Sequence, residues 1–220
     1  MLSWLYFIGR LLVIIILLLL TNWQVKGKKN IPAQGSLLVV SNHINLADPP
    51  VIGASLNRKA LFMAKEELFR SRLTRYFISS LGAFPVYRGK LDRKALRHAE
   101  KALADGSVLV MFPEATRSKN AQLQPAFSGS AMIAQKNNVQ ILPIGITGTE
   151  KLRNKTWFLR RPRITVNIGT PFYLPSSNGK LTKSELPELT TLIMEHIADI
   201  LPAEYQGVYA KQGKKNDTKN

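Results

Sequence analysis

Short apolar runs rich in Val, Ile and Leu alternate with segments of helical periodicity, and this alternation limits the possible folds more than any other feature. The runs expected to form strands are 36–41, 60–64, 83–87, 107–112, 140–147 and 163–168. The segments expected to form helices are 49–56, 66–81, 91–104, 127–136 and 184–201. The pattern predicts an α/β fold, with a single mixed, largely parallel sheet flanked by helices.

The first 23 residues are almost wholly apolar, and the stretch 11–20 contains no polar residue. A helix that is apolar on every side prefers lipid, so we expect residues 1–23 to form a membrane-inserted anchor helix. We expect the side chain of Arg10 to snorkel to the membrane surface. Either a tilted span or insertion of 11–20 into one leaflet satisfies this pattern. A cleaved signal peptide is a weaker alternative, because no small-x-small cleavage site follows the apolar run.

Three lysines, Lys26, Lys28 and Lys29, follow the apolar segment. By the positive-inside tendency they place the rest of the chain on the cytoplasmic face of the cell membrane. Residues 24–205 would then form one folded domain, and 206–220 a polar C-terminal tail.

The chain of 220 residues carries 31 Lys and Arg against 14 Asp and Glu, a net charge of +17. This charge favours an anionic partner such as a phosphorylated substrate, nucleic acid or acidic lipid. Basic and aromatic residues do not alternate as they do on stacking surfaces, so we do not expect nucleic acid. The chain has no Cys and three widely separated His residues, so we expect no metal site.

A candidate catalytic pair follows the first core strand, where Pro49 and Pro50 favour Asp48 as an N-cap and a helix beginning at Pro49. Residues five apart on one helix point away from each other, so His43 and Asp48 can meet only through a turn. The carboxylate would then hold one imidazole nitrogen and leave the other free to take a proton from a hydroxyl. With no Ser or Cys nucleophile beside it, the pair points to activation of the substrate's own oxygen. The alternative is that Asp48 only caps the helix and His43 only packs.

Three further segments carry polar groups or a proline at strands. Arg88 offers a planar fork of donors to a phosphate. Glu114, Thr116 and Arg117 combine an acid, a hydroxyl and a guanidinium, a mixture that fits a polyol phosphate. The alternative for Arg88 is an ordinary exposed Arg. The alternative for the second segment is a surface ion pair between Glu114 and Arg117. Pro143 interrupts an apolar strand and indicates a bulge or an edge near a site.

Together these segments resemble the glycerolipid acyltransferase family. The family's order and approximate spacing are matched by Asn42-His43-x4-Asp48, Phe84-Pro85-Val86-Tyr87-Arg88, Phe112-Pro113-Glu114-Ala115-Thr116-Arg117-Ser118 and Leu142-Pro143-Ile144. The resemblance runs from about residue 25 to residue 171 and implies that His43 is a general base oriented by Asp48. It also implies an acceptor-binding set, which consists of Arg88, Glu114, Thr116 and Arg117.

Two residues depart from the family pattern. Ala115 stands where the family usually has Gly, and Ser128 where it often has Lys. If the backbone at position 115 needs a positive φ, Ala incurs a strain of about 1 kcal/mol.

Within the family, the resemblance is to bacterial enzymes that acylate 1-acylglycerol 3-phosphate, a lysophosphatidic acid. It implies transfer of a fatty acyl group to the 2-hydroxyl, giving phosphatidic acid. The donor would be an acyl thioester, either acyl-CoA or acyl carrier protein, with no further cofactor, and the acceptor a membrane lipid. One alternative is an acyltransferase for glycerol 3-phosphate or another lysolipid. The other is a membrane-tethered basic binding module in which the His–Asp pair is incidental.

Overall fold

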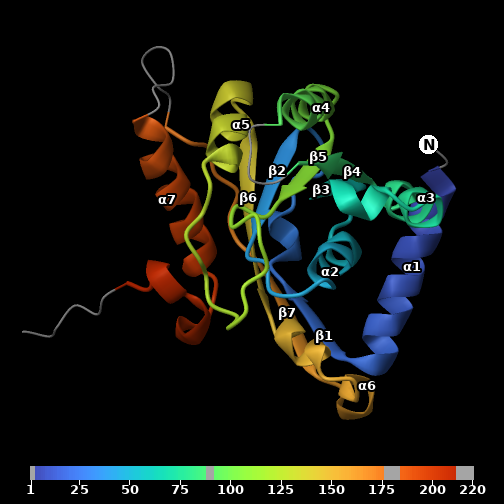
Figure 1. Cartoon of the computed structure of the whole chain (residues 1–220). Coiled ribbons are helices and arrows are strands. Elements are labelled where there is room, and N and C mark those ends of the chain that lie inside the picture. The colour runs from blue at the N-terminus through green and yellow to red at the C-terminus, as the bar shows by residue number, and fades with distance from the viewer. Residues whose placement is uncertain (1–2, 88–91, 176–183, 212–220) are drawn as a thin grey trace, which may run out of the picture.

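The computed structural model describes residues 3–87, 92–175 and 184–211, and in these ranges seven strands form one sheet (Figure 1). The strands are β1 (Asn22–Lys26), β2 (Leu37–Ser41), β3 (Ala60–Lys65), β4 (Ala83–Val86), β5 (Val108–Met111), β6 (Gln140–Thr147) and β7 (Arg163–Ile168). Their order is β1-β7-β6-β2-β5-β3-β4, and neighbours are parallel except β6 and β7. The mixed, largely parallel sheet expected from the sequence is therefore confirmed.

Helices cover both faces of this sheet. One face carries α4 (Arg93–Ala104), α5 (Gly129–Asn137) and α7 (Glu185–Ala198), and the other carries α1 (Ser3–Leu20) and α2 (Asp48–Ser55) (Figure 1). Every residue of β2 is buried. Leu38 and Val40 pack in the core beneath α4, α5 and α7, and Leu37 and Val39 pack in the core beneath α1 and α2. A strand buried on both faces needs apolar residues at consecutive positions, which explains the unbroken apolar run in the sequence.

Most expected elements agree with the structure to within a few residues, and β6 and β7 have the expected bounds. The sequence does not predict β1, because its alternately exposed and half-buried residues form no apolar run. The helix expected over 66–81 is interrupted, since a 3-10 turn (Glu66–Phe69) precedes α3 (Arg72–Ser80). The one-turn helix α6 (Trp157–Arg160) is also absent from the sequence prediction.

Parallel strands bring three loops to one edge of the sheet. The carboxyl ends of β2, β5 and β6 meet there, because β2 lies between the other two and runs parallel to both. The loops that follow these strands contain residues 42–47, 112–128 and 148–153. Asn42 extends the β2–β6 pairing, since its side-chain amide donates to the carbonyl of Ile146 and accepts from the N–H of Ile146, both at 2.8 Å.

Pro143 lies in β6, a central strand between β2 and β7, so the edge position that we considered is wrong. Its carbonyl accepts the N–H of Gly169 at 2.9 Å, just beyond the end of β7. The N–H and C=O of a strand residue point to the same side, so the N–H that Pro143 lacks would face the same segment as its carbonyl. That segment lies between β7 and the isolated bridge Ile141–Phe172, where the regular pairing is interrupted. The proline is tolerated because no regular pairing is required there.

α1 is apolar around its circumference, yet one side packs on the domain and the other is exposed. Tyr6 and Leu17 are buried on the inner side. The exposed stripe consists of Trp4, Phe7, Ile8, Leu11, Leu12, Ile15, Ile16, Leu18 and Leu19. Within the described ranges, no helix combines the length and the apolar character that crossing a membrane requires.

Arg10, on the inner side of α1, binds the end of α2. Its guanidinium donates to the carbonyls of Gly53 (3.1 Å), Ala54 (3.1 Å) and Leu56 (2.8 Å). These carbonyls have no partner within the helix and lie at the negative end of its dipole. The expectation that Arg10 snorkels is therefore wrong, because α2 satisfies the guanidinium inside the protein.

Replacing Arg10 with Met should lower the free energy of unfolding by about 2 kcal/mol, because the last turn of α2 loses a charged donor. Urea denaturation in detergent measures this change. Arg72→Met is the matched control, since Arg72 is exposed and we find no hydrogen bond or ion pair of its side chain among the described residues. Equal stability of the two variants would contradict the capping role of Arg10.

Candidate functional site

The loop between β2 and α2 brings His43 and Asp48 together. The imidazole Nδ1 lies 2.8 Å from Oδ2 of Asp48, and the same oxygen accepts the backbone N–H groups of Ile44 (2.6 Å) and Asn45 (2.7 Å). Asp48 is fully buried and His43 is 6% exposed. One carboxylate oxygen therefore fixes both the loop and the imidazole.

The start of α2 differs slightly from the prediction. The helix begins at Asp48 itself, Ala47 is the N-cap and Pro49 occupies the second helical position. Asp48 does not cap the helix with its side chain, because its carboxylate turns back into the preceding loop. With Nδ1 bound to Asp48, Nε2 is the imidazole nitrogen that remains for a substrate.

Phe112, the first residue after β5, stacks on the ring of His43. The ring centroids are 4.2 Å apart and the planes are inclined by 23°. Phe112 also lines an apolar cavity of about 410 Å³. The other side chains of its lining come mainly from strands β3 to β5 and helices α4 and α5, among them Met63, Val86, Leu96, Met111 and Met132. One aromatic ring thus contacts both the imidazole and a space suited to an aliphatic chain.

The loop after β5 binds both backbone groups of His43. The N–H of His43 donates to Oε1 of Glu114 at 2.9 Å, and the N–H of Ser118 donates to the carbonyl of His43 at 2.7 Å. The other carboxylate oxygen of Glu114 accepts the N–H of Gln124 at 3.0 Å. Glu114 is 1% exposed, and its two carboxylate oxygens thus bind backbone N–H groups of both loops.

Burial raises the pKa of Glu114 from 4.5 to about 7. The hydrogen bonds from the N–H groups of His43 and Gln124 lower this pKa, and the negative charge of Asp48 raises it further. Desolvation is the largest of these effects, because a charged carboxyl loses its hydration inside the protein.

Thr116 and Arg117 lie in the same loop but are exposed. We find no protein partner for either side chain among the described residues, so both are available to an anionic ligand. Arg88 lies outside the described residues. Ala115 has a φ of 54°, which meets the condition set out from the sequence and implies a backbone strain of about 1 kcal/mol. No group of three or more His or carboxylate side chains in the described part of the chain could hold a metal ion.

The sequence gives no role to Phe112 or Ser118, although both lie in a segment that resembles the family. Their place in the segment that follows a strand was the only available signal, and it does not tell which neighbour a side chain or backbone amide will meet. The structure assigns Phe112 to the imidazole face and the Ser118 amide to the backbone of His43.

Comparison with known proteins adds a family to this geometry. A family model described as Acyltransferase matches residues 22–147. A 1-acyl-sn-glycerol-3-phosphate acyltransferase of Streptococcus pneumoniae is 28% identical, covering 86% of this chain and 69% of its own length. One of Bacillus subtilis is 24% identical, covering 84% of this chain and 92% of its own length. The crystal structure of the 1-acyl-sn-glycerophosphate acyltransferase from Thermotoga maritima has a TM-score of 0.66 at 28% identity, covering 89% of this chain and 76% of that chain.

The raised pKa of Glu114 predicts a pH-dependent stability. Between about pH 4.5 and pH 7 the folded protein keeps a proton that the unfolded chain releases, so stability falls as the pH rises through this window and levels off above it. The expected loss is at most about 3 kcal/mol. Urea denaturation at a series of pH values measures it.

Glu114→Gln is the control, because an amide cannot ionise. This variant should be less stable overall, since its NH2 group must face one of the two backbone N–H donors. Its free energy of unfolding should nevertheless lack the fall with rising pH that the wild type shows. The same slope in both proteins would show that Glu114 is not the titrating group.

Proposed function

The chain belongs to the acyltransferase family, and we propose that it transfers a fatty acyl group from an acyl thioester to the 2-hydroxyl of 1-acyl-sn-glycerol 3-phosphate, giving phosphatidic acid. The observation that carries this proposal is the buried His43–Asp48 pair. The imidazole Nδ1 lies 2.8 Å from Oδ2 of Asp48, and Nε2 is left for a substrate. The names of the relatives support this acceptor, and the position of the imidazole supports His43 as the base.

In the proposed reaction, Nε2 of His43 removes the proton of the 2-hydroxyl as that oxygen attacks the thioester carbonyl carbon. The carbon–sulfur bond then breaks, and the protonated imidazole returns its proton to the leaving thiolate. Asp48 stabilises the imidazolium between these two steps. The acyl group passes directly to the acceptor, so the reaction needs neither an acyl-enzyme nor a metal.

The surroundings of the pair suit both parts of such an acceptor. Thr116 and Arg117 are exposed donors in the loop that binds His43, and they suit the phosphate. The resemblance adds Arg88 to this set, and that residue lies outside the described ranges. The carboxylate of Glu114 holds His43 in place by accepting the backbone N–H of His43. The apolar cavity behind Phe112 has the chemical character that an acyl chain requires. Either an acyl-CoA or an acyl carrier protein is an acidic donor, and the net charge of +17 favours both.

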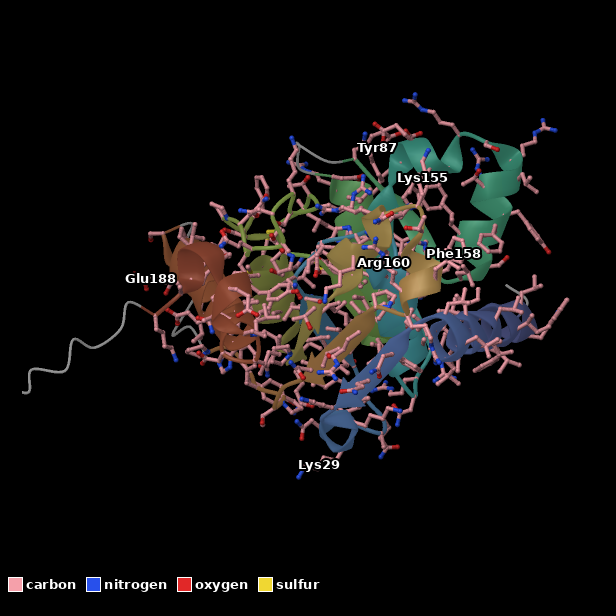
Figure 2. All side chains as sticks on the ribbon, turned by 90° about the horizontal axis from the view of Figure 1, so that it is seen from below. Lys29, Tyr87, Lys155, Phe158, Arg160 and Glu188 are labelled. Carbon is pink, nitrogen blue, oxygen red and sulfur yellow. The ribbon has the colours of Figure 1, made fainter. Side chains whose placement is uncertain are left out.

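We further propose that α1 lies in the cytoplasmic leaflet of the cell membrane with its exposed stripe in lipid. Its inner side is bound to α2 through Arg10, which favours insertion along one leaflet over a span. α6 lies beside the end of α1 in both views, and Figure 2 shows Phe158 and Arg160 on it. Arg161 donates to the carbonyl of Leu18 at 3.1 Å. Aromatic and cationic side chains beside an apolar helix are typical of a membrane interface.

Purified protein should convert lysophosphatidic acid and an acyl thioester to phosphatidic acid, and His43→Ala should lower kcat by at least about 1000-fold. Release of free thiol and mass spectrometry of the lipid product measure the reaction. Glycerol 3-phosphate and lysophosphatidylcholine in parallel assays test the other acceptors. His98→Ala is the control, because His98 is exposed and stacks on Phe84, away from Asp48. Equal rates in wild type and His43→Ala would eliminate the proposed base.

The double variant Leu12→Asp/Leu19→Asp should bind vesicles at least about 10-fold more weakly than wild type, since each substitution removes a buried leucine from lipid. Flotation with vesicles of phosphatidylglycerol and phosphatidylethanolamine measures binding. Val208→Asp is the control, because Val208 is 65% exposed and lies far from α1 along the chain. Unchanged flotation of the double variant would remove α1 as the membrane contact.

A further inference from the structure

Arg153 lies outside all four segments that resemble the family, yet it contacts two of the loops around His43. It ends a 3-10 turn, η3 (Thr149–Arg153), which follows β6. Its Nη1 donates to the carbonyl of Lys119 at 2.6 Å, and its Nη2 donates to the carbonyls of Ser118 (2.6 Å) and Ile44 (2.8 Å). One guanidinium therefore joins the loop after β2 to the loop after β5.

These contacts complete a ring of hydrogen bonds around the backbone of His43. The carbonyl of His43 accepts the N–H of Ser118, and the carbonyl of Ser118 accepts from Arg153. Arg153 also binds the carbonyl of Ile44, whose N–H donates to Asp48. A shift of Arg153 would thus act on the backbone at Ile44, the residue that follows His43 and donates its N–H to Asp48.

The turn that carries Arg153 is itself held in place. Gly148, which precedes η3, has a φ of 89°, and a Cβ at this position would overlap the backbone of Arg163 in β7. On the other side, the hydroxyl of Tyr205 donates to Oε1 of Glu150 at 3.0 Å. Because η3 is held against β7 and bonded to the chain after α7, Arg153 can hold the two loops in place relative to these elements.

The form of the guanidinium matters more here than its charge. Its three acceptors are backbone carbonyls, and no carboxylate among the described residues forms an ion pair with it. A planar fork reaches carbonyls of two segments at once, whereas an ammonium group is a compact point charge. Hydrogen bonds from a charged donor are also stronger than those between neutral groups.

We propose that Arg153 is a positioning residue that fixes the loop of His43 and so sets where Nε2 meets the acceptor hydroxyl. This inference rests on the proposed acyl transfer. A displacement of about 1 Å at a reacting group can cost about 100-fold in rate, so the loss of Arg153 should reduce kcat while substrate binding persists.

Arg153→Met should lower kcat by about 100-fold and change the KM for lysophosphatidic acid by no more than about twofold. Arg153→Lys should recover only part of the rate, because the ammonium cannot span the three carbonyls. Lys151→Met is the matched control, since it removes one exposed positive charge from the same turn, and it should match wild type. A raised KM with unchanged kcat, fully recovered by Lys, would assign Arg153 to phosphate binding and overturn the proposal.

A second readout follows the histidines directly. Diethyl pyrocarbonate modifies accessible imidazoles, and mass spectrometry can compare buried His43 with the more accessible His98 and His196. In Arg153→Met and Arg153→Lys, modification of His43 should speed up relative to the other two. Equal acceleration at all three would mean general unfolding, and no acceleration would mean an undisturbed loop; either result overturns the positioning role. If wild type itself transfers no acyl group, the proposed function fails, while this comparison still tests the contact of Arg153.

Discussion

One carboxylate oxygen determines the form of the loop on which the site depends. Oδ2 of Asp48 accepts from the imidazole of His43 and from the backbone N–H groups of Ile44 and Asn45, and the residue is fully buried. Buried donors without a partner are costly, so this loop cannot relax without leaving polar groups unsatisfied. The helix that carries Asp48 is held at its other end by Arg10, which links α1 to the site through one short helix.

The segment from Phe112 to Ser118 serves two purposes that its sequence does not separate. Phe112, Glu114 and Ser118 point inward and hold the ring, the N–H and the carbonyl of His43. Thr116 and Arg117 are exposed and remain available to a ligand. Ala115, with its positive φ, lies at the turn between the two sets. The strain at Ala115 is the cost of this change in direction.

The first helix illustrates how a uniform composition can hide two different faces. Apart from Arg10, the side chains of α1 are almost all apolar, so sequence periodicity alone cannot tell which side meets protein. Packing on α2 buries Tyr6 and Leu17 and leaves the opposite stripe exposed. Arg10 lies on the inner side for the same reason, and its charge is satisfied by helix carbonyls and not by a membrane surface.

The sequence by itself determined the α/β class, the bounds of β6 and β7, the family and the meeting of His43 with Asp48 across a turn. These features follow from local periodicity, proline geometry and short spacings, which act between residues close in the chain. Only the tertiary structure decided that Glu114 faces His43, that Arg10 caps α2 and that Arg153 bridges two loops. His43 and Glu114 lie 71 residues apart, Arg10 and Gly53 lie 43 apart, and Arg153 and Ile44 lie 109 apart. Contacts at such separations depend on how strands order themselves in the sheet, and no local pattern encodes that order.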